Sequence, residues 1–376
     1  MDRERVLSLC EQALAACAAD EVMVHLALGS SALTRFADNH IHQNVAEETG
    51  HLSVRAFVGA RSGIATTSDL SGSGIRDAAQ RALALARVAE ADPEYLPLPP
   101  PVPIEHLSVS VPATAACGPT QRAEAVRTII AVAREAGQIA SGAFAVGAGW
   151  RAVATSAGVR ACEQTTSASL RTVIMARDSS GFASATSRDV RDIDPLALGR
   201  TASAKAAASA QPVTVEPGQW DVILEPEAVG TIVDLTARLT FGALAFQEGR
   251  SAICGKLGQQ VCGDNITLWD DASDPRALAP SFDYEGMPTR KVQLIVRGVA
   301  SGLVHDTRTA ARAGVRTTGH ATGPGGWGPM PAALFLHPGS ATLEEMIAST
   351  QRGLLVTRFH YTNVLSPRQT VLTGMT

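Results

Sequence analysis

The sequence predicts an α+β fold with mostly antiparallel sheets and flanking helices. Segments of alternating or β-branched residues follow one another across short turns rich in Gly, Ser and Asn, which favours hairpins. Amphipathic helical stripes precede and follow these runs of strands, as in α+β folds. The 376 residues, 45 % of them hydrophobic, are enough for two or three domains that each bury a core.

The first range, residues 1–91, is predicted to be an α+β domain. Apolar residues at helical spacing predict a helix over residues 3–18. Four strands should follow, at His25–Leu28, Ala32–Ala37, Ile41–Val45 and Leu52–Val58. A second helix, capped by Ser71 or Ser73, closes the range with an apolar stripe of Ile75, Ala79, Leu83 and Ala86.

A proline-dense segment at residues 92–105 is predicted to be a linker, because proline breaks helices and lacks the donor that a central strand needs. Residues 106–215 should form a middle region. Thr120 is expected to cap a helix that ends near Gly137. Antiparallel strands are expected at Phe144–Thr155, Val159–Gln164, Ser167–Arg177 and Gly181–Thr186, and Asp194-Pro195 should open a helix to about Ala210.

The third range, residues 216–376, is predicted to be a C-terminal domain. Pro226 suits the first turn of one long helix from Glu227 to about Phe246. Arg297-Gly298 should be a tight hairpin turn. Thr342 and Glu345 form a capping box for a helix ending at Gly353. Short strands are expected at Trp220–Leu224, Ile266–Trp269, Val292–Val296 and Leu303–Val304.

Composition excludes several classes of function. A net charge of −4, a pI near 6.1 and scattered basic residues argue against a nucleic-acid surface. No apolar stretch of spanning length is present, and the start, MDRERVLSL, does not resemble a signal peptide, so no membrane association and a cytoplasmic location are expected. Six cysteines without a Cys-x-x-Cys pair predict reduced, mostly buried thiols.

Two pairs of residues could carry chemistry. His40 and His42 lie two apart on a predicted strand, so they share a face and could hold a metal ion, although the polar residues around them are more typical of a solvated face. Asp283 and Glu285 could act as paired carboxylates in acid/base work, or serve structure and substrate contact. Cys254 has no base predicted near it, so it is interpreted as a small buried hydrophobe.

Four motifs in the last third resemble the C-terminal half of the TldD/PmbA family of zinc peptidases, in the same order and spacing. A weaker resemblance to the opening domain of that family lies in residues 34–70, including Ser53-Val54-Arg55 and Ala65–Leu70. The resemblance implies a two-domain architecture. The four motifs are GKLGQQV at 255–261, FDYEGMPT at 282–289, TTGH at 317–320 and PGSATLEEMI at 338–347.

The resemblance implies a two-fold dimer in which a zinc-activated water cleaves an extended peptide held in an internal cleft. Catalytic, TldD-type members carry His-Glu-x-x-x-His on a helix. The corresponding window here, Asp234–Leu239, contains no imidazole, and no histidine occurs between His106 and His305. The chain therefore matches the metal-free TldE or PmbA type, with no cofactor of its own.

The resemblance also implies partners and cleft residues. A TldD-type catalytic subunit would supply zinc in a heterodimer, with a homodimer as the other possibility, and unstructured peptides would be the substrate. The residues implied near the cleft are Asp283, Glu285, Gly286, Thr318, Gly319 and His320. The alternative is a self-associating, non-enzymatic protein that binds peptides through exposed strand edges. A zinc enzyme that uses His40 and His42 is a third hypothesis.

The sequence departs from this family pattern in two places, one that bears on the assignment to the metal-free type and one that bears on the length of the chain. Residues 353–376 resemble the TldD branch more than the PmbA branch, so the assignment to the metal-free type rests on the missing histidines alone. Members of the family also continue through further strands, which include the third zinc ligand of the TldD type, beyond the point that corresponds to Thr376. The sequence given is either naturally short or a fragment.

Overall fold

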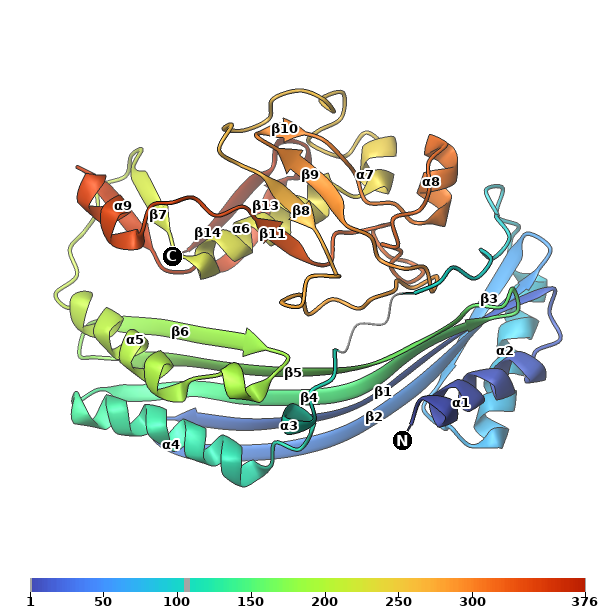
Figure 1. Ribbon diagram of the computed structural model, residues 1–376, viewed down its shortest axis with the longest axis horizontal. Helices are drawn as coiled ribbons and strands as arrows, with labels where there is room; N and C mark the ends of the chain where they lie inside the picture. Colours follow the sequence, from blue (N-terminus) through green and yellow to red (C-terminus); the bar gives the residue numbers. More distant parts are fainter. Residues whose placement is uncertain (1, 105–108, 376) are drawn as a thin grey trace. The chain divides into compact units, whose positions relative to one another are not determined.

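The computed structural model of the chain describes residues 2–104 and 109–375 (Figure 1). The described chain divides into two compact units. The first contains residues 2–101 and 109–214, and the second contains residues 102–104 and 215–375. Both units combine helices with sheets whose strands are mostly antiparallel, so the predicted α+β class is confirmed. No helix in the described residues is long and apolar enough to cross a membrane.

The first unit is built on one six-stranded antiparallel sheet in the order β3-β2-β1-β4-β5-β6. Its two central strands, β1 and β4, pair from Met23 with Thr155 to Phe36 with Gly142. This pairing joins the predicted N-terminal and middle ranges in one sheet. The strands are β1 Glu21–Ala37, β2 His40–Val58, β3 Arg61–Thr67, β4 Ile139–Thr155, β5 Arg160–Met175 and β6 Ser180–Ser187.

These strands are longer than the sequence predicts. Strand β1 runs without interruption through Gly29, Ser30 and Ser31, where the sequence suggests a turn, and β2 and β5 each replace two predicted strands. Gly29 pairs with Thr49 on one side and with Gly149 on the other. Because both neighbours supply main-chain hydrogen bonds, the low strand propensity of Gly and Ser is overridden. The prediction of separate short strands was wrong here.

Helices flank the six strands as two copies of one pattern, in which a helix is followed by three strands and a second helix. The pair α1 and α2 packs at one end of the sheet and the pair α4 and α5 at the other (Figure 1). Both pairs cover the face that carries the even-numbered residues of β1 and β4, such as Leu26 and Phe144. The helices are α1 Arg3–Ala16, α2 Gly72–Val88, α3 Pro112–Ala115, α4 Pro119–Glu135 and α5 Pro195–Ala208, with a 3-10 turn η1 at Val190–Asp192.

Helix starts in this unit agree with the sequence at two places and differ at a third. The side chains of Ser71 and Asp194 accept main-chain N–H groups at the starts of α2 and α5, as predicted. Helix α4, however, begins one residue before Thr120, with Gly118 in the capping position and no side-chain cap. Pro119 can occupy the first helical position because that position needs no donor. The predicted Thr120 cap was wrong.

Residues 92–104 contain no helix or strand, as the proline-dense sequence suggests. The predicted boundary between residues 105 and 106 lies outside the described residues, and the three predicted domain ranges stay a prediction.

The six cysteines are all free, and Cys10, Cys17, Cys117 and Cys162 are buried.

The second unit holds a small four-stranded sheet in the order β10-β9-β8-β11 and two two-stranded sheets, parallel β12-β7 and antiparallel β13-β14. A core of aromatic and aliphatic residues, including Phe241 and Leu294, lies between helix α6 and the four-stranded sheet. The strands are β7 Asp221–Leu224, β8 Leu268–Asp270, β9 Val292–Val296, β10 Val299–Ala300, β11 Leu334–Leu336, β12 Gly353–Val356, β13 His360–Ser366 and β14 Val371–Met375.

The long helix predicted from Glu227 to Phe246 is broken in two. Helix α6 ends at Thr240, and a short helix follows Gly242, whose main chain bridges to Val304. A Cβ on Gly242 would lie 2.4 Å from the carbonyl oxygen of Pro329, so the close approach requires glycine. Val304 forms only this isolated bridge, and the strand predicted at Leu303–Val304 was wrong. The helices are α6 Pro226–Thr240, α7 Ala243–Gln247, α8 Thr307–Ala313 and α9 Leu343–Ser349, with a 3-10 turn η2 at Pro367–Gln369.

Two local predictions in this unit are confirmed. Arg297 and Gly298 both adopt positive φ, of 48° and 77°, in the tight turn between β9 and β10. At the start of α9, the side chains of Thr342 and Glu345 each accept the other residue's main-chain N–H, which is the predicted capping box. The predicted end of this helix at Gly353 was wrong, because α9 ends at Ser349 and Gly353 begins β12.

Candidate functional site

Helix α6 carries the window that the sequence aligns with a metal-binding motif. Within this window, Arg238 Nε donates to Asp234 Oδ1 at 2.8 Å, one helical turn apart, and both side chains are about half exposed. The carboxylate is thus held by a guanidinium on its own helix. Residues 234–239 offer no second ligand beside it, because the other side chains are Leu, Thr, Ala, Arg and Leu.

A groove of about 330 Å³ lies between helix α6 and strand β11. Its lining is apolar apart from Asp234, whose charge is paired with Arg238. Strand β11 is the last strand of its sheet, so among the described strands only β8 pairs with it. A groove beside an open strand edge can accept an extended chain. The lining residues are Pro226, Val229, Gly230, Val233, Asp234, Pro331, Ala332, Leu334 and Leu336.

Asp270 fixes the segment that begins this groove wall, and sequence reasoning missed it. Its Oδ2 accepts the main-chain N–H groups of Ala332 at 2.6 Å and Ala333 at 2.7 Å. Its Oδ1 lies 2.9 Å from Nε2 of His320, and both of these side chains are completely buried. The signal available in the sequence was an acidic pair, Asp270-Asp271, directly after a predicted strand.

The predicted site residues at 283–286 and 318–320 come together in two loops that run side by side. Arg290 N donates to Thr318 O at 2.9 Å, and Tyr284 N donates to Ala321 O at 3.1 Å. Asp283 Oδ2 accepts the N–H of Ala321 at 2.8 Å, which ties the loops together. The two segments that contain these residues are therefore neighbours in the fold.

Within these loops the polar side chains form hydrogen bonds to groups of the protein itself. Asp283 is 5 % exposed, and its Oδ1 accepts the N–H groups of Glu285 and Met287, each at 2.9 Å. His320 is 3 % exposed, and its Nδ1 lies 2.9 Å from Oγ1 of Thr318. Gly286 has a φ of 74° and completes the turn. In this structure Asp283 and His320 position main chain, and a role for the set in lining a cleft stays a prediction.

Glu285 has the most unusual electrostatic setting of the group. Its Oε2 accepts the main-chain N–H of Thr307 at 3.0 Å and also the hydroxyl of that residue, at the start of helix α8. Burial, and to a lesser extent the nearby carboxylates of Asp283 and Asp306, raise the pKa of Glu285 from 4.5 to about 7. The hydrogen bonds from Thr307 oppose this shift.

The raised pKa of Glu285 predicts a pH dependence of stability. Between pH 4.5 and about 7 the folded chain holds a proton that the unfolded chain has lost, so the free energy of unfolding should fall as pH rises through this window. The decrease should be on the order of 3 kcal/mol. E285Q cannot ionise but still accepts from Thr307, and it should remove this decrease. Urea unfolding from pH 4.5 to 8 measures it.

The matched control for this measurement is E344Q, which neutralises an exposed glutamate in helix α9. It should keep the pH profile of the parent chain, because an exposed carboxylate is solvated in both states. Equal profiles for E285Q and the parent chain would contradict the assignment of the pH dependence to Glu285.

Gly319 holds the two loops at a distance that only glycine permits. Its φ is 72°, and a Cβ there would lie 2.1 Å from the carbonyl oxygen of Pro288. Gly314, which ends helix α8, has a similar φ of 65° but no atom within 4 Å of the same position. An alanine at Gly314 would therefore suffer only from its left-handed backbone conformation, whereas an alanine at Gly319 would also clash with the main chain of Pro288.

This comparison predicts unequal effects of alanine at the two positions. G314A should lower the free energy of unfolding by about 1 kcal/mol, the cost of a left-handed conformation for an L-residue. G319A should cost at least about 2 kcal/mol more, because main chain cannot move aside cheaply. Urea unfolding of both variants tests this, and similar losses would show that the loops can separate freely.

The histidine pair proposed from the sequence as a metal site lies elsewhere, at the start of β2. His40 and His42 are both exposed, and Nδ1 of His40 lies 2.6 Å from the carbonyl oxygen of Asp38. Among residues 2–104 and 109–375, no group of three or more His, Cys, Asp or Glu side chains is arranged to hold a metal ion. The strand pair alone supplies two ligands, fewer than a stable zinc site uses.

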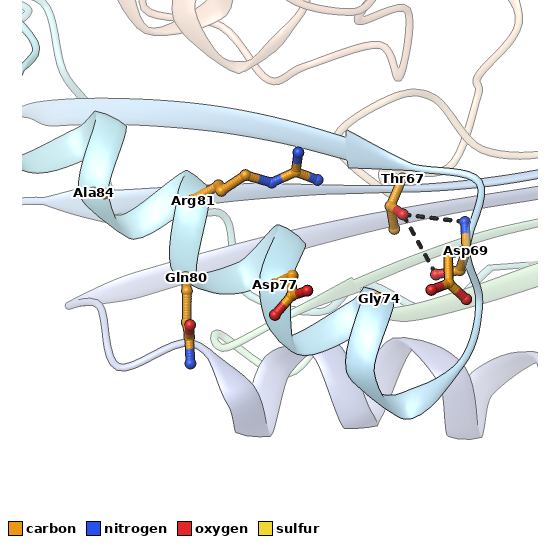
Figure 2. Close-up of a pocket in the computed structure, with 7 residues that line it drawn as sticks. All are labelled: Thr67, Asp69, Gly74, Asp77, Gln80, Arg81 and Ala84. Atoms are coloured by element: carbon orange, nitrogen blue, oxygen red, sulfur yellow. Dashed lines mark hydrogen bonds between the residues drawn. The ribbon is translucent and has the colours of Figure 1, made fainter.

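Another hollow lies in the first unit beside the start of helix α2 (Figure 2). Figure 2 shows Asp69 in the turn before the helix, with Thr67 and Gly74 next to it. Asp69 Oδ1 accepts the N–H of Ser71 at 2.9 Å, and this bond lowers the pKa of Asp69. The carboxylate thus serves the turn that begins α2, and the hollow contains no second feature that points to a ligand.

Parts of both units match family models of metallopeptidase domains. The family model described as the PmbA/TldA metallopeptidase C-terminal domain matches residues 217–375, and the model described as PmbA/TldA metallopeptidase domain 1 matches residues 29–86. The matched ranges include helix α6, its groove and both loops of the candidate site.

Individual relatives agree with these matches. An uncharacterised protein of Methanocaldococcus jannaschii is 29 % identical over 185 residues, which are 49 % of this chain and 44 % of the relative. A metalloprotease of Methanothermobacter thermautotrophicus is 26 % identical over 159 residues, 42 % of this chain and 35 % of the relative. The matched stretches thus span less than half of the length of these two relatives.

A solved structure is similar over nearly the whole chain. The crystal structure of TldE from Thermococcus kodakarensis superposes with a TM-score of 0.85 and 21 % sequence identity, over 95 % of this chain and 82 % of that one. At this identity the likeness shows the fold, which is the TldD/PmbA-like fold that the sequence motifs imply.

Proposed function

Because the chain belongs to the PmbA/TldD metallopeptidase family, we propose that it is the non-catalytic, TldE/PmbA-type subunit of a zinc peptidase complex. The observation that carries this proposal is the window at residues 234–239 of helix α6. Where a catalytic subunit needs two imidazoles and a carboxylate, this helix has an ion pair, Asp234 with Arg238, and two leucines.

Zinc, which the family implies, does not fit the groups present in this window. A tetrahedral zinc site needs three protein ligands and a water, with the ligands free to coordinate. The carboxylate of Asp234 is hydrogen-bonded to Arg238, and replacing that bond by a metal would leave a guanidinium facing a cation. We therefore assign no chemical step to a metal in this chain. The zinc belongs to a TldD-type partner under this proposal.

The function left for this chain is to shape a peptide cleft. The groove beside β11 offers an apolar wall and an open strand edge to an extended peptide. Asp270 holds the main chain of Ala332 and Ala333 in its wall through buried hydrogen bonds, so this part of the surface is organised before substrate arrives. An unstructured peptide is the substrate class that suits such a surface, because its main chain is free to pair.

The metal content of the purified chain tests the non-catalytic assignment. We expect less than one zinc per chain after refolding with zinc and gel filtration, and no peptide hydrolysis by the chain alone. Elemental analysis measures the first and a quenched fluorescent peptide the second. One zinc per chain that disappears in the double variant H40A/H42A would overturn the assignment.

A second function is compatible with the open edge of β11: peptide binding by a self-associating chain with no hydrolytic partner. Light scattering distinguishes the two functions by the assembly that forms. A heterodimer with a TldD-type subunit is expected for the peptidase complex, and a homodimer is expected for the self-associating protein. Peptide binding that is unchanged by a TldD-type subunit, together with a failure of the two chains to associate, would favour this second function.

A further inference from the structure

A pocket of about 590 Å³ lies on the helix-bearing face of the six-stranded sheet, and the peptidase assignment gives it no role. Its floor consists of residues from the middle of β1, β2 and β4, most of them small or aliphatic, with Asn44 and Glu48 as the polar exceptions, and one side is formed by α3 and the start of α4. The floor residues on this face are Ser30, Ala32, Asn44, Ala46, Glu48, Val146 and Ala148.

Arg122, from the first turns of helix α4, lines this pocket although its side chain is almost fully enclosed. It is 2 % exposed. Its guanidinium donates from Nε to Thr34 Oγ1 at 3.2 Å, from Nη1 to the carbonyl oxygen of Cys117 at 2.9 Å, and from Nη2 to Asn44 Oδ1 at 2.9 Å. All three acceptors are neutral, and no carboxylate in the described residues is hydrogen-bonded to this buried guanidinium.

Arg122 also has more N–H donors than hydrogen bonds. A guanidinium has five N–H groups, two each on Nη1 and Nη2 and one on Nε. The three hydrogen bonds use one N–H on each nitrogen, which leaves one donor on Nη1 and one on Nη2. A planar guanidinium can present one donor from Nη1 and one from Nη2 to the two oxygens of a carboxylate.

The position of Arg122 at the start of its helix adds to the electrostatic cost of burying its charge. Helix α4 is 17 residues long, and its N-cap, Gly118, provides no side-chain acceptor. The positive end of the helix dipole therefore lies beside a buried cation instead of an anion. Burying a charge without a counterion normally costs several kcal/mol. An anion in the pocket would relieve both effects.

We propose that this pocket binds an organic carboxylate, with the carboxylate on the two remaining donors of Arg122 and an apolar body on the floor of Ala32, Ala46 and Val146. Glu48, on the same face of β2, also lines the pocket, and it is not hydrogen-bonded to Arg122. Its negative charge disfavours a dianion such as phosphate and favours a singly charged ligand. The proposal is independent of whether the chain takes part in peptide cleavage.

Calorimetric titration of the full chain with sodium benzoate tests the proposal, with sodium chloride and sodium phosphate at the same ionic strength as comparisons. We expect benzoate to bind at one site per chain and phosphate to bind more weakly. R122Q should weaken benzoate binding by at least about tenfold. R122K should also weaken it, because an ammonium lacks the planar fork. The matched control R127Q removes an exposed arginine from the same helix and should change binding by less than about twofold.

The location of the ligand can be decided even if the Arg122 variants do not fold. Crystals of the unmodified chain soaked with p-bromobenzoate should show the anomalous signal of bromine in the pocket, with the carboxylate against Arg122. Absence of benzoate binding by the unmodified chain, bromine only outside the pocket, or phosphate binding as tight as benzoate binding would overturn the proposal.

Discussion

A mixture of this chain with a TldD-type subunit is expected to cleave an unstructured peptide at least about 100-fold faster than either chain alone, because positioning of a substrate can remove several kcal/mol from a barrier. The physical reason lies in the groove beside β11, which can hold an extended chain while the partner supplies the activated water. Initial rates with a quenched fluorescent peptide measure the effect. Equal activity of the partner with and without this chain would contradict the proposed function.

A matched pair of leucine variants tests whether the groove carries this effect. Leu336 lies on β11 in the groove wall and is 39 % exposed, while Leu355 lies on β12 outside the groove and is 43 % exposed. L336R should block the groove and lower the rate of the mixture by at least about tenfold, because a charge would have to be desolvated under the peptide. L355R should leave the rate nearly unchanged. The zinc content of the partner should be the same in both mixtures.

Replacement of Asp270 by alanine is expected to cause the largest loss of stability in the second unit, about 4 kcal/mol in the free energy of unfolding. The variant would leave two main-chain N–H groups and the buried ring of His320 without their partner. Urea unfolding followed by tryptophan fluorescence measures the loss, since Trp269, stacked on Phe335, is next to Asp270.

The control for Asp270 is Asp274, which pairs with Arg276 at the surface at 2.7 Å. D274A should cost about 1 kcal/mol, well below the loss for D270A, because Arg276 is exposed and its guanidinium and main-chain N–H can bond to water when the carboxylate is removed. A loss below about 1 kcal/mol for D270A would mean that water or a rearranged loop satisfies the three groups. In that case Asp270 does not organise the groove wall.

The sequence predicted the kinds of elements well and their lengths less well. Helical spacing located α1 and α2, the Asp194-Pro195 pair located the start of α5, and turn residues located the break at Arg297-Gly298. Strand β1 was divided wrongly because Gly29 and its serine neighbours look like a turn in isolation. Their strand conformation comes from β2 and β4, which pair with them from distant parts of the chain.

In the candidate site, too, residues in sequence motifs could be predicted, and residues whose role depends on contacts to distant parts of the chain could not. Motifs in the sequence brought Asp283 and His320 together, because both belong to segments with a recognisable pattern. Asp270 lacks such a pattern, and its importance depends on three groups contributed by distant residues. Arg122 was missed for the same reason: only the fold reveals that this arginine is enclosed among neutral acceptors.

The repeated arrangement of the first unit has a consequence for the way the chain reaches its native state. Within each half, hairpins join strands that are neighbours in sequence, such as Val58 with Arg61, so little chain entropy is lost when they close. The seam between the halves instead joins Met23 to Thr155. Non-local pairing of this kind is intrinsically slow. Until the seam forms, each half exposes a long unpaired edge of β1 or β4, and during synthesis the first half must wait with that edge open to aggregation.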